Sequence, residues 1–175
     1  AADVLGHIPA AKLREVMRGM SAPEAKQIND LLQYPEDTAG GTMQTEVIAV
    51  PEDLTIAEAI EMLRPEEENL PNGIFYIYVV DAEYRLRGVL RVRDLLFSPP
   101  NRKIRDIMVP GVRSVSVHAD QEEIARLFRA YGFSAMPVVD DFQRLRGVVT
   151  ADVVFDIVEE EATEDMQRMV GLSGE

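Results

Sequence analysis

The chain of 175 residues contains no cysteine, and this absence removes several kinds of site at once. Without thiols there can be no disulfide, no thiolate nucleophile and no cysteine-bound zinc or iron–sulfur cluster. Long apolar runs are missing too: no stretch of the sequence is long enough to span a bilayer, and no signal peptide is visible. We therefore expect the chain as given to be soluble and cytosolic.

Basic residues are scarce. Lys and Arg number 18 against 31 Asp and Glu, which gives a formal net charge of -13. This balance opposes binding to nucleic acid and to anionic membranes, because both depend on basic surface. It is compatible with the attraction of cations. The alternative interpretation is an acidic surface that serves solubility alone.

Catalytic motifs are missing from the sequence as well. The two histidines, His7 and His118, are isolated, and residues 132–136 lack the second glycine of a nucleophile elbow. There is no phosphate-cradling loop of the Gly-Lys-Ser/Thr type. The sequence therefore predicts a protein that is not an enzyme.

One stretch of the sequence occurs twice. Residues 79–89 read Val-Val-Asp-Ala-Glu-Tyr-Arg-Leu-Arg-Gly-Val, and residues 138–148 read Val-Val-Asp-Asp-Phe-Gln-Arg-Leu-Arg-Gly-Val. Such a close internal repeat indicates a duplicated structural unit. In each copy a β-branched run ends at an Asp, a polar turn follows, and Leu and Val resume, which predicts a pair of short strands. Each copy then enters a short helix, at residues 92–97 and 151–157.

The duplication extends upstream, because residues 43–64 align with residues 108–129 without a gap. In each copy a short strand precedes a helix with a capping pair, Thr55 with Glu58 and Asp120 with Glu123. The unit is therefore strand, helix, strand, strand, helix, given twice. Each unit is too small to hold a core alone, so we expect an α/β (α+β) fold in which the two units pack sheet against sheet.

The segments that flank the repeats differ from them. Residues 1–42 have the apolar spacing of helices, but residues 34–43, with Pro and two adjacent glycines, are predicted to be a loop or linker. Residues 65–73 form an acidic loop, and an acidic helix with an apolar stripe is predicted from residue 152 to residue 169. The predicted divisions are a helical segment with linker at 1–42, a first unit at 43–103, a second unit at 104–158 and the start of an acidic connecting helix at 159–175.

Taken together, the two repeats resemble a pair of cystathionine-β-synthase (CBS) domains over residues 43–158. The resemblance is carried by the Val-Val-Asp turns, by the Gly-Val strands that follow them, and by Met-Pro-Val-Val at residues 136–139. It implies a tandem CBS fold whose flat pairs associate into disk-like dimers.

A narrower resemblance is to the cytosolic region of MgtE-type magnesium transporters. Pro-Glu-Asp-Thr-Ala-Gly-Gly-Thr-Met at residues 35–43 and Glu-Ala-Thr-Glu-Asp-Met at residues 161–166 look like the flanks of the CBS pair in that family. Residues 1–42 look like the end of its acidic N-terminal superhelical domain. The resemblance implies an Mg2+ sensor on the cytoplasmic side of the membrane, which forms a homodimer through its CBS domains and gates a transmembrane domain beyond Glu175.

The acidic helix offers a physical switch. Glu161 and Asp165 are four residues apart, as are Asp156 and Glu160, so each pair shares one helix face. Each like-charge pair costs about 0.2–0.5 kcal/mol in an isolated helix, and a divalent cation removes this cost. Mg2+ needs only one or two carboxylates per site, because it keeps several of its waters. The alternative is a solvated acidic face without a bound ion.

By resemblance to the MgtE family, the cation-binding positions map onto five acidic residues of this sequence: Asp120, Glu122, Asp156, Glu161 and Glu164. At two further positions where the family has carboxylates, this sequence has Gly132 and Val153. The resemblance therefore implies Mg2+ sites that are fewer, weaker or rearranged, with Asp152 as a candidate substitute for the missing carboxylate at the adjacent position.

Adenine nucleotides are the competing ligands for such a module. In CBS domains the ribose is commonly held by the Asp of a Thr-x-x-Asp motif after the Gly-Val strand. The first repeat has this Asp, Asp94, but Arg91 in place of the Thr; the second repeat has the Thr, Thr150, but Val153 in place of the Asp. Asp94 and Thr150 are therefore the candidate residues for ATP or another adenine nucleotide. The alternative function is a nucleotide-binding CBS module that controls another protein.

Overall fold

The computed structural model describes residues 34–64 and 76–156. The predicted helices before residue 34, the acidic loop at 65–73 and the connecting helix after residue 156 lie outside the described residues. The chain divides into two compact units, one of which consists of Gln44–Ser114 and Pro137–Val148. Of the described residues, the other unit contains 34–43, 115–136 and 149–156.

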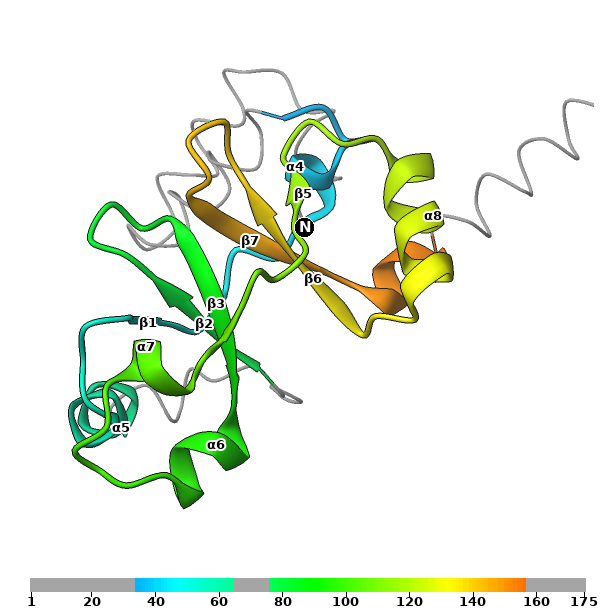
Figure 1. Cartoon of the computed structure of the whole chain (residues 1–175). Coiled ribbons are helices and arrows are strands. Elements are labelled where there is room, and N and C mark those ends of the chain that lie inside the picture. The colour runs from blue at the N-terminus through cyan, green and yellow to red at the C-terminus, as the bar shows by residue number, and fades with distance from the viewer. Residues whose placement is uncertain (1–33, 65–75, 157–175) are drawn as a thin grey trace, which may run out of the picture. The chain divides into compact units, whose positions relative to one another are not determined.

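Three strands of the first repeat and a short strand from the start of the second, β4, form a four-stranded sheet in the order β1-β2-β3-β4 (Figure 1). Strand β1 is parallel to β2, whereas the β2–β3 and β3–β4 pairs are antiparallel. The parallel pair follows from the crossover through α5, since parallel neighbours cannot be joined by a tight turn. The elements are β1 (Ala49–Pro51), α5 (Ile56–Leu63), β2 (Tyr76–Val80), β3 (Leu86–Arg91), α6 (Val92–Phe97), α7 (Ile104–Ile107) and β4 (Val109–Pro110).

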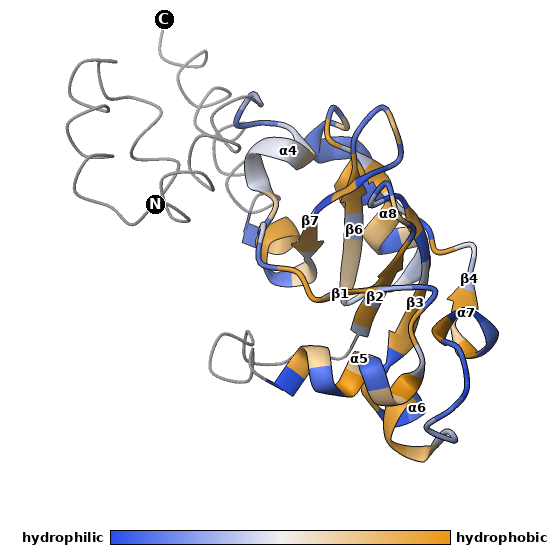
Figure 2. Ribbon diagram, turned by 90° about the vertical axis from the view of Figure 1, so that its left-hand side faces the viewer, coloured by the Kyte–Doolittle hydropathy of each residue, from blue (hydrophilic) through white to orange (hydrophobic). Residues whose placement is uncertain are grey.

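The core of this repeat lies between one face of the sheet and its helices. Strand residues that alternate along β2 point to this core, because successive side chains of a strand face opposite ways. In Figure 2 the strands are strongly hydrophobic, and α5 alternates between hydrophobic and hydrophilic residues, as expected of a helix with one buried face. The buried cluster comprises Val50, Ile56, Ala59, Ile77, Val79, Leu90, Leu95 and Ile104.

Both predicted helix caps are confirmed. At the start of α5, the Thr55 N–H donates to Glu58 Oε2 at 2.7 Å, and the Glu58 N–H donates to Thr55 Oγ1 at 3.3 Å. At the start of α8 (Gln121–Tyr131), the Glu123 N–H donates to Asp120 Oδ1 at 2.7 Å. These bonds satisfy amides that have no partner within the helix, so the two helices begin where the sequence indicates.

The second repeat forms a three-stranded sheet in the order β5-β6-β7. Its elements are β5 (Val115–Ser116), α8, β6 (Ala135–Val139) and β7 (Leu145–Thr150), and residues 151–156 are again helical. Both repeats thus follow the predicted order of strand, helix, strand, strand, helix, which confirms the α/β expectation. The structure adds α7 and β4, which the sequence analysis did not predict. The packing of one sheet against the other stays a prediction.

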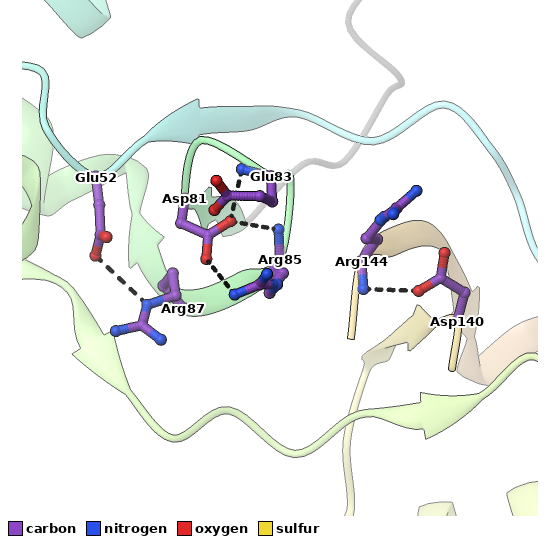
Figure 3. Close-up of polar contacts among 7 residues, drawn as sticks. All are labelled: Glu52, Asp81, Glu83, Arg85, Arg87, Asp140 and Arg144. Atoms are coloured by element: carbon purple, nitrogen blue, oxygen red, sulfur yellow. Dashed lines mark hydrogen bonds and ion pairs between the residues drawn. The ribbon is translucent and has the colours of Figure 1, made fainter. Parts of the chain in front are cut away.

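The two repeated turns are held in the same way (Figure 3). Asp81 Oδ1 accepts hydrogen bonds from the N–H groups two and four residues further on, at 3.0 and 2.8 Å. Asp140 Oδ1 accepts the two equivalent bonds, both at 2.9 Å. Each turn also contains a non-glycine residue with positive φ, Tyr84 at 65° and Gln143 at 62°. The same Asp therefore stabilises the same unusual turn in both copies.

The turns also bond to each other, within the unit that contains them both. The Leu86 N–H donates to the Gln143 carbonyl, and the Leu145 N–H donates to the Tyr84 carbonyl, both at 3.0 Å. The two acceptors are the residues with positive φ. The repeats are thus joined by a reciprocal pair of backbone hydrogen bonds at the turns that the sequence shows twice.

This junction places two arginines, Arg85 and Arg144, directly opposite each other as a non-hydrogen-bonded antiparallel pair. Like charges at such positions repel, and each guanidinium has a neighbour that offsets the repulsion. Arg85 Nη1 lies 3.9 Å from Asp81 Oδ2. The Arg144 guanidinium lies 4.9 Å from the centre of the Phe142 ring, which is within the range of a cation–π contact.

Residues 34–43, predicted as a loop or linker, form a docked segment that contains the short helix α4 (Ala39–Thr42). The Ala39 N–H donates to the Ala119 carbonyl at 2.8 Å, and the Gly40 N–H donates to the Val117 carbonyl at 2.9 Å. The docked segment is therefore fixed to the stretch that precedes α8. The linker prediction is wrong here, because the adjacent glycines serve close packing rather than flexibility.

The close packing is visible at both glycines. A Cβ atom on Gly40 would overlap the Tyr34 ring, and a Cβ atom on Gly41 would overlap the Pro35 carbonyl oxygen. Any side chain at these positions must displace its neighbours, and displacement of backbone is harder than displacement of a ring.

We expect the substitution Gly40→Ala to lower the free energy of unfolding by about 1–3 kcal/mol, the usual cost of an overpacked site. Urea unfolding of the whole chain measures this loss. In a Tyr34→Ala background, where the ring no longer occupies the space, Gly40→Ala should cost much less. An equal loss in both backgrounds would contradict the contact.

Candidate functional site

Asp120, the first predicted cation ligand, lies where the docked segment meets α8. Its Oδ1 caps the helix, and its backbone forms a β-bridge with Thr38. The next residue, Gln121, donates its N–H to the Asp37 carbonyl at 3.1 Å. A carboxylate has about four lone-pair positions, so the cap leaves Asp120 able to coordinate a cation as well.

Glu122 is exposed in the first turn of α8, beside Glu123. From the docked segment, the Glu36 carbonyl accepts a hydrogen bond from Gln121 Nε2 at 3.5 Å. Acidic residues of both segments therefore lie close to Gln121 along the backbone. Nevertheless, within residues 34–64 and 76–156 no three acidic or histidine side chains stand close enough together to hold a metal ion.

The other predicted cation ligands belong to the last helix. Asp156 is exposed at the end of the helical residues 151–156. Glu161 and Glu164 lie outside the described residues. The assembly of the five ligands into one or more Mg2+ sites therefore stays a prediction.

Gly132 and Val153 are the two residues that stand where the MgtE resemblance leads us to expect carboxylates. Gly132 ends α8 in the left-handed conformation with φ of 64°, where any side chain would be strained. Val153 is half-buried next to the buried Val154. Asp152, the candidate substitute, is exposed, and the Thr150 hydroxyl holds the pKa of its carboxyl below the ordinary value.

Asp94, the candidate nucleotide residue of the first repeat, is held by Arg91. Arg91 Nε donates to Asp94 Oδ2 at 2.9 Å, and Arg91 Nη2 donates to Asp94 Oδ1 at 3.2 Å. Arg91 is the last residue of β3 and the N-cap residue of α6, so Asp94 stands in the first turn of that helix. The hydrogen bonds from Arg91 lower the pKa of the Asp94 carboxyl, which therefore stays charged. The two-pronged contact also fixes the plane of the carboxylate.

Tyr76, which sequence analysis did not propose as a site residue, lies directly opposite Arg91 in the antiparallel β2–β3 pair. Its side chain is 42% exposed. Tyr78, two residues on, is buried, and burial raises its pKa to about 12. An exposed aromatic ring, a guanidinium and a carboxylate therefore share one end of the first sheet. The alternation in β2, combined with the register of the hairpin, is the signal that could have located Tyr76.

Thr150, the candidate nucleotide residue of the second repeat, ends β7. Its Oγ1 is buried and makes no hydrogen bond of standard geometry, although it lies near enough to Asp152 to lower the pKa of that carboxyl. A buried hydroxyl without a good partner is uncommon, and a ligand or a water could satisfy it. The two repeats thus carry different side chains at equivalent positions.

Comparison with known proteins identifies the module. Residues 39–100 and 104–160 match the family model of the CBS domain. The magnesium transporter MgtE of Thermus thermophilus is 45% identical over 146 residues, which cover 82% of this chain and 32% of that protein. The chain spans about a third of the length of the curated relatives it matches.

Two solved structures have a similar fold. The cytosolic domain of the Mg2+ channel MgtE in complex with ATP has a TM-score of 0.79 and 39% identity, covering 89% of this chain and 64% of that one. The soluble part of a magnesium transporter has a TM-score of 0.80 and 35% identity, covering 92% and 62%. The first belongs to a channel and the second to a transporter. In the part of this chain that the structure describes, no helix has the length and apolar character needed to cross a membrane.

Proposed function

The chain belongs to the CBS-domain family, and we propose that it is the Mg2+-sensing regulatory region of a magnesium transporter. It would act on the cytoplasmic side of the membrane and gate the transporter's own membrane domain. The observation that carries this proposal is the similarity to MgtE over most of the chain. The net charge of -13 supports it, because a cation sensor needs a surplus of carboxylates.

The proposed mechanism is electrostatic. Two like charges 4 Å apart repel by about 1 kcal/mol in water and about 4 kcal/mol near a protein surface. Acidic surfaces brought together without a cation would therefore separate. A divalent ion between two carboxylates replaces their repulsion with an attraction of each carboxylate to the ion. Mg2+ does so while keeping several waters. A few such pairs are enough to shift a conformational equilibrium by an order of magnitude or more.

The docked segment supplies a mechanical connection for this mechanism. Its backbone is bonded to Ala119 and Val117, immediately before the candidate ligand Asp120. The docked segment is therefore tethered to the start of α8. A cation at Asp120 and Glu122 would act next to this tether.

We expect about 10 mM Mg2+ to raise the thermal midpoint of chelator-treated protein. For a dissociation constant of about 1 mM, binding to the folded form adds about 1.4 kcal/mol, which corresponds to a shift of roughly 3–6 °C for a chain of this size. About 30 mM NaCl, which has the same ionic strength, is the control for screening. An unchanged midpoint, together with unchanged compactness in small-angle scattering, would count against the sensor.

Variants can assign the Mg2+ shift to particular carboxylates. Asp120→Asn is the sharpest variant, because Asn caps a helix as well as Asp does while it lacks the charge. It should leave the metal-free stability nearly unchanged and reduce the shift, as should Glu161→Ala combined with Glu164→Ala. Glu83→Gln, an exposed acidic residue in the first repeated turn, is the matched control and should leave the shift intact.

We also propose that the chain forms a homodimer, and α6 is the favoured surface for it. Three apolar residues of this six-residue helix are exposed: Val92 by 40%, Leu96 by 69% and Phe97 by 84%. Burial of apolar surface at about 25 cal/mol per Å2 would favour association. Leu96→Asp should therefore lower the dimer fraction in sedimentation equilibrium. Phe142→Asp, at a turn residue that is 66% exposed, is the matched control; equal loss in both variants, or a monomeric parent, would contradict this surface.

A second candidate function is the binding of an adenine nucleotide, which we infer from Asp94, Arg91 and Tyr76 and from the similar structure described in complex with ATP. The carboxylate could accept hydrogen bonds from ribose hydroxyls, and the exposed ring could contact the base. Titration calorimetry with ATP, ADP and AMP tests this function. We expect binding that weakens at least tenfold in Asp94→Asn, since hydrogen bonds to a charged group are worth about 1.5–3 kcal/mol. Heat changes equal to those of dilution for all three nucleotides would rule the function out.

A further inference from the structure

We propose that the junction of the two repeated turns is a surface that contacts the membrane. In it, Arg85 and Arg144 bind the phosphate of an anionic lipid headgroup. The exposed rings of Tyr84 and Phe142 enter the membrane interface beside that phosphate. The choice of a lipid rests on the membrane-side location proposed above, whereas the surface itself is argued from the turns alone. It shares no residue with the candidate Mg2+ and nucleotide sites.

The backbone places the two arginines side by side. Arg85 and Arg144 are directly opposite each other, and the reciprocal backbone bonds of the junction flank them, each at 3.0 Å (Figure 3). This is the narrow, non-hydrogen-bonded position of an antiparallel pair, where the Cα atoms are about 4.5 Å apart, and side chains directly opposite each other share one face. An oxyanion between the guanidinium groups replaces their repulsion with two attractions. The planar fork of each arginine also matches the oxygens of a phosphate.

The acidic residues of the turns do not hold these guanidinium groups tightly. Arg85 Nη1 lies 3.9 Å from Asp81 Oδ2, which is beyond hydrogen-bond distance, and the Arg85 side chain is 51% exposed. Asp81 and Asp140 each use Oδ1 for the amides of their own turn. The Arg144 guanidinium lies over the Phe142 ring, 4.9 Å from its centre. A phosphate at the surface therefore competes with weak contacts only at Arg85 and finds Arg144 supported from the side by a ring.

The exposed aromatic rings favour a lipid as the source of the phosphate. Phe142 is 66% exposed and Tyr84 is 44% exposed, and each lies next to or in contact with one of the arginines. Aromatic rings settle at the boundary between water and the acyl chains, and basic side chains beside them reach the headgroups. A free phosphate ion would gain nothing from the rings. The combination therefore fits a membrane surface better than a dissolved anion.

The junction is fixed before any ligand arrives. Each turn is held by its own Asp, the two turns are bonded to each other, and Tyr84 keeps a φ of 65°. A surface that is ordered in advance loses little conformational freedom on association.

The net charge of -13 opposes contact between the whole chain and an anionic membrane. At physiological salt, however, charges are screened over about 8 Å, so the groups nearest the headgroups decide the interaction. Glu83 and Asp141, both exposed in the turns, are opposing charges within the proposed surface. Removal of the Glu83 charge should therefore strengthen membrane binding.

The experiment is co-sedimentation of the whole, metal-free chain with vesicles of equal parts phosphatidylglycerol and phosphatidylcholine, compared with vesicles of phosphatidylcholine alone. We expect the parent to prefer the anionic vesicles. Arg85→Gln combined with Arg144→Gln should lower the partition coefficient roughly twentyfold, at about fivefold for each basic residue near the surface. The matched control is Arg126→Gln combined with Arg129→Gln, which removes the same charge from exposed positions on α8. It should change the partition coefficient by less than about twofold, because these charges lie outside the proposed contact.

Two single variants test the surface further. Tyr84→Asn should weaken binding to anionic vesicles while it keeps the turn, since Asn tolerates positive φ. Glu83→Gln should strengthen binding. The side-chain Nε–H signals of Arg85 and Arg144 in nuclear magnetic resonance spectra give a second reading, because they respond to contact even when only a small part of the chain is bound. Circular dichroism checks the fold of each variant.

Each contrary outcome has a distinct meaning. No sedimentation with anionic vesicles, together with unperturbed arginine signals, would overturn the proposal, and an intact rise of the thermal midpoint with Mg2+ would still leave the sensor standing. Equal losses in the two double variants would assign the binding to net charge alone. Arginine signals that move with inorganic phosphate but not with vesicles would make the pair a site for free phosphate. Signals that move with polyglutamate alone would assign the surface to an acidic protein segment, and either result overturns the lipid assignment.

Discussion

The fold depends on a carboxylate that organises a turn. Asp81 and Asp140 each bind two backbone amides of their own hairpin, and with those amides satisfied the chain can place a non-glycine residue at positive φ. The carbonyls of these residues, Tyr84 and Gln143, then accept the bonds that join the two hairpins. Loss of one carboxylate would leave these exposed amides to water and would weaken the turn and the junction together. The duplicated Asp is therefore a requirement of the backbone rather than a sign of chemistry.

The two repeats have the same residues where the backbone conformation requires them. They differ at positions where the side chain does not determine the backbone conformation. The turns share Asp, Arg, Leu and Gly at matching places. Immediately after them, Arg91 with Asp94 in one copy corresponds to Thr150 with Val153 in the other. Equivalent positions just beyond the shared turns therefore carry different chemistry in the two copies. Similarity between the repeats is consequently a poor guide to shared function.

Sequence analysis predicted well those features that depend on neighbours along the chain. Both helix caps join residues three apart, and the strands follow from the alternation of apolar and polar residues, so these elements could be predicted from the sequence. The docked segment was not, because the role of Gly40 depends on a bond to Val117, far along the chain. Tyr76 was missed for a related reason: its position opposite Arg91 depends on the hairpin register, which shifts at an irregularity between Val79 and Val80. The cation ligands could be named only by family resemblance, since their spacing in the sequence does not show which carboxylates meet.

The position of Asp120 constrains how a cation sensor could work here. The N-terminus of a helix carries a partial positive charge of about half a unit, which stabilises the capping carboxylate and opposes a cation bound to it. Asp120 and Glu122 alone would therefore hold a cation weakly, and within the described residues no third acidic side chain completes a site. If the missing ligands come from a second acidic surface, the ion binds far better when the two acidic surfaces are together than when they are separated. That difference in affinity is what allows an ion to shift a conformational equilibrium, so a weak, incomplete site at the start of α8 is better suited to sensing than a complete one would be.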